Sequence, residues 1–165
     1  MTETNDLQVT MVGDLEIAHT RVFDAPRRLV FAALTKPDLL RSWYGPVGWS
    51  VVNCEIDFRV GGAWRLVTRK PDGREIVQYG VFTAIASPDR FAKTERWIDW
   101  DVGEVVVTTE LVEHQGRTTL TSTARYPSKD VRDKLIAAGA NRDVREHYEK
   151  LEAFLASASA AQGRR

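Results

Sequence analysis

Hydrophobic and polar residues alternate along much of the chain, and short polar turns separate the alternating runs. This two-residue periodicity is typical of β-strands that bury one face. It predicts strands over residues 7–23, 49–57, 62–70, 75–86, 90–98, 103–114 and 117–126, with Gly13-Asp14 as a place where the first run can be interrupted. Because the turns between the later strands are short, we expect about seven strands, arranged largely as an antiparallel meander.

Two short helices are predicted between the first and second strands. Asp24 can cap a helix, Pro26 suits a first helical turn, and the apolar positions that follow predict a helix over residues 26–34. A second short helix begins around Pro37 and ends before Gly45-Pro46. Two helices of this length cannot form a core by themselves, so we expect them to connect parts of the sheet.

The C-terminal region changes to helical periodicity. Ser128 is a candidate helix cap, Gly139 interrupts the helix, and Asn141 can cap a second start. The apolar stripe of this last helix consists of Val144, Tyr148, Leu151 and Leu155. Spacings of four, three and four residues place these side chains on one face, so a long amphipathic helix is expected to pack on the sheet.

This layout predicts an α+β fold with a gap between the sheet and the last helix. The sheet must bury one face, and the last helix is the only long element available to cover it. A helix is about 10 Å across, so it cannot fill the concave face of a much broader curved sheet. The gap is therefore collapsed by large side chains, filled with water, or occupied by a ligand.

Residues of one parity along the strands are expected to face this gap. The inward sets are Trp64, Leu66 and Thr68; Val77, Tyr79 and Val81; Val105, Val107 and Leu111; and Leu120, Ser122, Ala124 and Tyr126. Each set is mostly apolar, and most include a hydroxyl group, which is the composition of a small-molecule pocket. Plain core packing is the alternative explanation of the same pattern.

Several short runs resemble one known protein family. They are Ala25-Pro26-Arg27-Arg28-Leu29-Val30-Phe31-Ala32-Ala33-Leu34-Thr35, Ser42-Trp43-Tyr44-Gly45-Pro46, Arg59-Val60-Gly61-Gly62-Ala63-Trp64, Gly80-Val81-Phe82, Pro88-Asp89-Arg90-Phe91 and Arg117-Thr118-Thr119-Leu120-Thr121. In order and spacing they resemble the helix-grip (START-like, SRPBCC) superfamily, and most closely its group named after the activator of the heat-shock-protein-ninety ATPase. The resemblance covers about residues 14–157. It implies a curved antiparallel sheet wrapped around a long C-terminal helix.

The resemblance implies the fold more specifically than the function, because members of the superfamily include lipid carriers, hormone receptors, polyketide cyclases and a chaperone activator. One position departs from the group, whose terminal helix usually begins with a Gly-Trp pair. Asp143-Val144 stand there in this chain. The smaller Val144 leaves more room under the helix or changes what fits there.

We therefore expect the chain to bind a hydrophobic or aromatic small molecule between the sheet and the C-terminal helix. The predicted ligand contacts are Trp43, Trp64, Leu66, Tyr79, Val81, Val107, Leu120, Ser122, Val144, His147 and Tyr148. A cyclase or hydrolase that uses the same cavity is one alternative. A co-chaperone-like module that contacts a chaperone and stimulates its ATPase is the other.

Catalytic motifs do not decide between these alternatives. There is no nucleophile elbow and no phosphate-binding glycine loop, and the histidines lack the spacing of metal ligands, so no metal and no cofactor are expected. His147 lies beside the apolar stripe and could act as a base at the cavity edge. Glu95 or Glu110 becomes a candidate acid or base if its side chain points inward.

Composition limits the partners and the setting of the protein. The 165 residues contain 23 Lys and Arg and 23 Asp and Glu, and this zero net charge disfavours a nucleic-acid partner. Cys54 is the only cysteine, and no apolar run is long enough for a membrane span. The acidic N-terminus lacks the features of a signal peptide, so a cytoplasmic location is expected. We expect one domain over 1–165, with an ordered core at about 7–157 and flexible ends.

Overall fold

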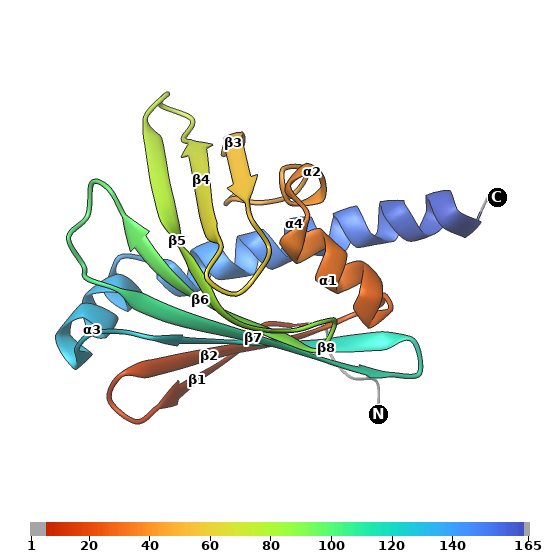
Figure 1. The fold of residues 1–165 in the computed structure, drawn as a ribbon, viewed down its shortest axis with the longest axis horizontal. Helices are drawn as coiled ribbons and strands as arrows, with labels where there is room; N and C mark the ends of the chain where they lie inside the picture. The colour runs from red at the N-terminus through yellow and green to blue at the C-terminus, as the bar shows by residue number, and fades with distance from the viewer. Residues whose placement is uncertain (1–5, 164–165) are drawn as a thin grey trace.

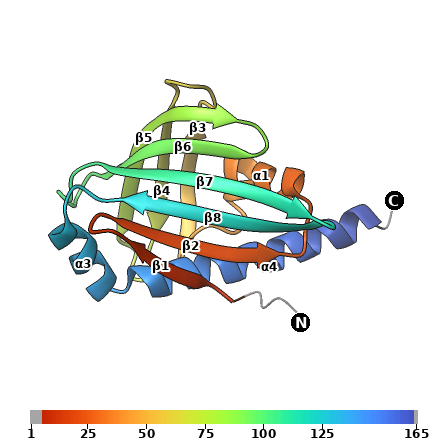
Figure 2. The same cartoon turned by 90° about the horizontal axis from the view of Figure 1, so that it is seen from below.

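The computed structural model describes residues 6–163, which form an eight-stranded antiparallel sheet and four helices. The strands are β1 (Gln8–Val12), β2 (Glu16–Phe23), β3 (Ser50–Ile56), β4 (Ala63–Arg69), β5 (Glu75–Ala86), β6 (Arg90–Trp97), β7 (Val105–His114) and β8 (Arg117–Arg125). The helices are α1 (Arg27–Thr35), α2 (Pro37–Leu40), α3 (Lys129–Ala137) and α4 (Ala140–Gly163). Figures 1 and 2 show the sheet curving around one side of α4, with α3 near one end and α1 near the other.

The strand order is β1-β2-β8-β7-β6-β5-β4-β3, so β3 to β8 form the predicted meander. Strand β2 joins the sheet by pairing with β8, from Glu16 opposite Arg125 to Phe23 opposite Thr118. The prediction of about seven strands was one too few, because residues 7–23 form a hairpin and not a single strand. Gly13 has a φ of +59°, which lets the chain turn back tightly between β1 and β2.

The α+β class, the two short helices and the long C-terminal helix were predicted correctly. Ser128 caps α3 as expected, since its hydroxyl oxygen accepts a hydrogen bond from the backbone N–H of Val131 at 3.1 Å. Helix α4 begins at Ala140 and continues to Gly163, beyond the expected end of the ordered core at residue 157. The outermost ends, 1–5 and 164–165, for which flexibility was predicted, lie outside the described residues.

Helix α4 is held on the sheet by its apolar stripe and by two polar contacts to β2. Tyr148, Leu151 and Leu155 are buried in the main core, where the Tyr148 ring packs edge-on against Phe23 with centroids 5.7 Å apart. His19 on β2 donates from Nε2 to Oδ1 of Asn141 at 2.8 Å, so Asn141 ties the start of the helix to the sheet. About three turns further along, buried Arg21 forms an ion pair with Glu152.

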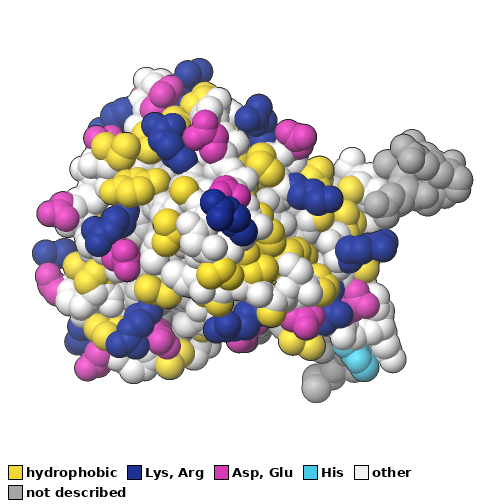
Figure 3. All heavy atoms as spheres, in the orientation of Figure 1, with side chains coloured by type: hydrophobic (Ala, Val, Ile, Leu, Met, Phe, Trp, Pro, Cys, Tyr) yellow, Lys and Arg dark blue, Asp and Glu magenta, His cyan; other side chains and the backbone are white. Residues whose placement is uncertain are grey.

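The surface carries both signs of charge. On the face drawn in Figure 3, basic and acidic side chains are interspersed and form no block of one sign. Among the described helices, none combines the length and the apolar character needed to cross a bilayer.

Replacement of Leu151 by alanine is predicted to destabilise the fold strongly, because this side chain is fully buried between α4 and the sheet. We expect the free energy of unfolding to fall by about 2–5 kcal/mol in urea titrations. Glu149→Ala, an exposed position on the same helix, is the matched control, with an expected change within about 0.5 kcal/mol. Equal effects of the two substitutions would show that α4 is not a core element.

Candidate functional site

A cavity of about 490 Å³ lies between the concave face of the sheet and the N-terminal half of α4. Eight of its lining residues are aromatic: Trp43, Tyr44, Trp49, Phe91, Trp97, Trp100, Tyr126 and Tyr148. Trp100 is 45% exposed and Ala138 is also exposed, so the cavity reaches the surface between the β6–β7 connection and the α3–α4 junction.

The cavity exists because α4 contributes no large aliphatic side chain along its first turns. Ala140, Asp143, Val144 and His147 line it, and only from Tyr148 onward does the helix pack fully into the main core. A second apolar cluster, around Ile17, Val105 and Tyr126, packs against α3. Val105 and Tyr126 of this cluster also line the cavity, whereas other lining residues belong to the main core.

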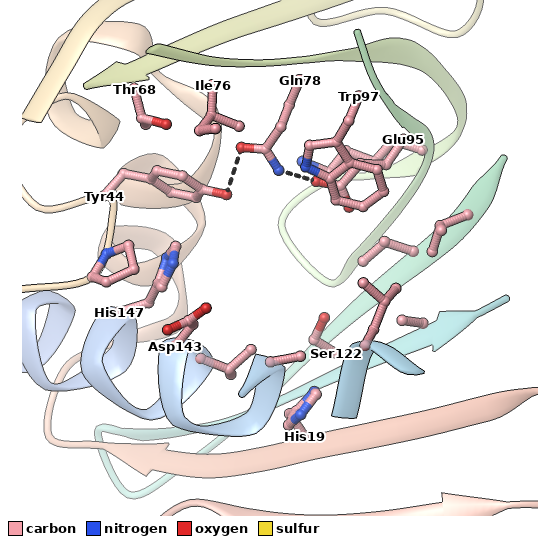
Figure 4. Close-up of a pocket in the computed structure, with 18 of the residues that line it drawn as sticks. His19, Tyr44, Thr68, Ile76, Gln78, Glu95, Trp97, Ser122, Asp143 and His147 are labelled. Carbon is pink, nitrogen blue, oxygen red and sulfur yellow. Dashed lines mark hydrogen bonds between the residues drawn. The ribbon is translucent and has the colours of Figure 1, made fainter. Parts of the chain in front are cut away.

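One wall of the cavity is polar. The Tyr44 hydroxyl donates to Oε1 of Gln78 at 3.4 Å, and Nε2 of Gln78 donates to Oε1 of Glu95 at 2.6 Å. Figure 4 shows this chain of three side chains along one side of the cavity, with His147 and Asp143 on α4 and with Ser122 and His19 on the opposite strands. Burial raises the pKa values of Glu95 and Tyr44, since neither side chain is well hydrated in its charged form.

Lys93 lies on the same face of β6 as Glu95 and also lines the cavity. Its Nζ lies over the ring of Trp64, 4.0 Å from the centroid. Burial lowers the pKa of Lys93, and the nearby Glu95 carboxyl acts in the opposite direction with a smaller effect. The cavity therefore holds an amine and a carboxyl, both shifted toward their neutral forms.

The two histidines of the cavity are also shifted toward neutrality. The His147 ring packs edge-on against Tyr44 with centroids 4.6 Å apart, and burial lowers its pKa to about 3, with Lys150 adding to the effect. Burial lowers the pKa of His19 as well, and its hydrogen bond to Asn141 partly opposes this. Burial raises the pKa of Asp143, which lies one turn before His147.

The predicted ligand contacts divide into groups by their place in the structure. Six of them line the large cavity: Trp43, Val107, Ser122, Val144, His147 and Tyr148. Trp64 and Leu66 point inward but border a separate small cavity of about 30 Å³. Leu120 is fully buried in the main core and lines neither cavity.

The inward orientation expected for Tyr79 and Val81 was wrong: these side chains are 39% and 40% exposed. The β4–β5 hairpin places Trp64 opposite Gly80, so Ile76, Gln78 and Phe82 share the inner face with Trp64. The Trp64 indole N–H donates to the Thr94 carbonyl oxygen at 3.0 Å. A Cβ at position 80 would lie 1.9 Å from that oxygen, so the close packing here needs glycine.

Sequence reasoning missed Gln78 and Lys93 and gave Glu95 only conditionally. The register of the hairpin turn at residues 70–74 was the available signal for Gln78, since it pairs Arg69 with Glu75 and thereby sets the parity of β5. For β6, the shared parity of Phe91 and Trp97 was the corresponding signal.

Glu110, the other carboxylate considered, is exposed and lies 3.4 Å from Arg90 in an ion pair. Among residues 6–163, no three His, Cys, Asp or Glu side chains cluster in a way that suits a metal ion.

Comparison with known proteins agrees with the fold. The family model described as "Activator of Hsp90 ATPase homolog 1-like protein" matches residues 24–156. A crystal structure of a protein from Rhodobacter sphaeroides is 28% identical, with a TM-score of 0.85 over 92% of this chain and 99% of that chain. A solution structure from Arthrobacter aurescens is 26% identical, with a TM-score of 0.83 over 91% of each chain. No curated protein matches the chain.

The low pKa of His147 predicts a specific pH dependence of stability. Unfolding returns the imidazole from a pKa of about 3 toward its ordinary value of 6.5, so the unfolded chain binds an extra proton between these values. Stability should therefore fall as the pH falls below 6.5, by up to about 1.4 kcal/mol per pH unit from this group. Removing the group with His147→Gln should make the urea-unfolding free energy less sensitive to acid.

The comparison is made between variant and wild type at each pH, because the raised pKa values of Glu95 and Asp143 favour the folded state as the pH falls. The unfolding free energy of the wild type minus that of the variant should become smaller, or change sign, as the pH is lowered from 7 to 4. A difference that is constant over this range would contradict the burial of a neutral His147.

Proposed function

This chain belongs to the family of Activator of Hsp90 ATPase homolog 1-like proteins, and we propose that it binds an apolar or aromatic small molecule in its cavity. The family is compatible with ligand binding and with activation of a chaperone ATPase. The observation that favours a ligand is the cavity of about 490 Å³, which is lined by eight aromatic side chains and is polar along one wall. Its volume lies in the range of about 300–1,000 Å³ that is usual for small-molecule sites.

The size of the cavity argues against an empty interior. At about 24 cal/mol per Å³, a dry cavity of this volume would cost about 12 kcal/mol. That cost is comparable with the whole stability of a typical domain, about 5–15 kcal/mol. Water or a ligand must therefore occupy the space. An apolar ligand that displaces water from the aromatic walls would gain about 25 cal/mol for each Å² of apolar surface buried.

The arrangement of polar groups suggests how such a ligand would lie. Tyr44, Gln78 and Glu95 supply hydroxyl, amide and carboxyl groups along one wall, whereas Val107 on β7 and Ala124 on β8 add apolar side chains to the lining. The ligand we propose has a largely apolar body and one polar end that bonds to this wall. Buried carboxyl and amine groups in the same cavity make an enzyme that acts on the bound ligand the second candidate function.

Ligand binding is predicted to raise the melting temperature and to change tryptophan fluorescence, since four of the lining residues are tryptophans. A screen of flavonoids, fatty acids and polyketides by thermal shift is the direct measurement. A ligand present at a hundred times its Kd should stabilise the fold by about 2.7 kcal/mol.

Two substitutions test whether the hits occupy this cavity. Ser122→Trp and Val144→Trp each place a large ring in the space, so both variants should remain folded and lose ligand binding. Val112→Trp is the matched control, because Val112 is 64% exposed on β7 and its replacement should leave binding unchanged. If no ligand is found and both cavity variants lose about 1–3 kcal/mol, the interior is a filled core. A chaperone contact would then be the leading hypothesis.

A further inference from the structure

Of the described lysines, Lys70 and Lys93 both lie over tryptophan rings, and of these two only Lys93 lines the cavity. Lys129 and Lys134 form ion pairs with carboxylates one helical turn away, and Lys150 donates to backbone carbonyl oxygens. Lys93 forms no hydrogen bond or ion pair among the described residues, and its Nζ lies over the Trp64 ring, 4.0 Å from the centroid. The side chain borders both the large cavity and the small one beside it.

The surroundings of this amine favour its nucleophilic form. Burial lowers the pKa of Lys93 and so increases the fraction of unprotonated amine. A lysine desolvated in an apolar pocket is one of the standard ways in which proteins activate an amine toward carbonyl compounds. The Trp64 ring is itself held by its hydrogen bond to the Thr94 carbonyl oxygen, so the platform beneath Nζ is fixed.

Glu95 supplies an acid near the amine. It lies two residues after Lys93 on the same strand face, and same-face neighbours along a strand are about 7 Å apart. Gln78 bonds to its Oε1, and burial raises the pKa of the carboxyl, which favours the protonated form. A raised pKa, which the nearby Lys93 partly opposes, makes this carboxyl a better proton donor within the cavity.

We propose that Lys93 forms an imine with an apolar aldehyde or ketone that enters the cavity. The Nζ lone pair attacks the carbonyl carbon, and a proton moves from nitrogen to the carbonyl oxygen to give a carbinolamine. Glu95 protonates the hydroxyl, water leaves, and the second proton of the amine returns to Glu95. One C=N bond replaces one C=O bond, and the released water carries both amine protons. This inference rests on the proposed ligand-binding function and names the class of ligand.

The test uses cinnamaldehyde as the carbonyl probe and cinnamyl alcohol as its partner that cannot form an imine. The full-length protein is incubated with cinnamaldehyde and cyanoborohydride near neutral pH, and the reduced adduct is detected by intact mass and located by peptide mapping. We expect one adduct per chain, on Lys93. Because mapping is done on the wild-type protein, the result does not depend on any variant being folded.

Variants then test the role of each group. Lys93→Arg keeps a long basic side chain but removes the primary amine, so it cannot form an imine and should lower labelling at least about tenfold. Lys134→Arg, on the exposed face of α3, is the matched control and should label like the wild type. Glu95→Gln retains an amide oxygen that can accept from Gln78 but loses the acidic proton, so it should slow labelling of Lys93.

The alcohol separates failure of this inference from failure of the proposed function. If cinnamyl alcohol raises the melting temperature but cinnamaldehyde labels surface lysines as readily as Lys93, the imine is overturned and ligand binding stands. If neither compound stabilises the protein and no adduct forms on Lys93, the probes contradict the imine and count against an accessible cavity. Labelling confined to Lys93 and blocked by excess cinnamyl alcohol supports both.

Discussion

The structure depends on one geometric constraint: one long helix, with short helices beside it, covers the concave face of an eight-stranded curved sheet. Helix α4 is tied to β2 near its start by His19 and Asn141, and further along by Arg21 and Glu152. Its close packing on the core begins at Tyr148, whereas the first turns face the sheet across open space. Protein interiors are otherwise close-packed, so the cavity follows from a helix that is anchored but too narrow to fill the face.

Burial of the titratable side chains beneath α4 determines the chemistry of the cavity. Charged forms lose hydration there, so the pKa of Glu95 rises while those of Lys93 and His147 fall. All three groups move toward neutrality, and the cavity is best suited to an uncharged ligand that has a polar end. Ligand binding and imine formation both depend on the apolar walls, since these walls bury the ligand and, by excluding water, lower the pKa of Lys93.

The main features of the fold were predictable because they depend on local periodicity and turn residues. Alternation identified the strands, the short turns identified the meander from β3 to β8, and Ser128 marked the start of α3. The hairpin of β1 and β2 was missed as a separate pair, since alternation continues on both sides of Gly13-Asp14 and an interruption of one strand explains the same pattern. Three of the predicted ligand contacts that line the cavity are Ser122, Val144 and His147. Their positions were predictable because strand parity places Ser122 inward, and helical spacing places Val144 and His147 on or beside the apolar face of α4.

The sequence by itself determined the α+β class, the order of the elements and the family, because these follow from periodicity and from motifs that are contiguous in the chain. Only the tertiary structure decided that Gln78 faces inward and Tyr79 outward, since both parities of β5 contain apolar residues and the hairpin register chooses between them. It also decided that the pKa of Lys93 falls and that of Glu95 rises. A pKa shift of this kind comes from the removal of water by β-strands and a helix that are distant in sequence, and no local pattern records that removal.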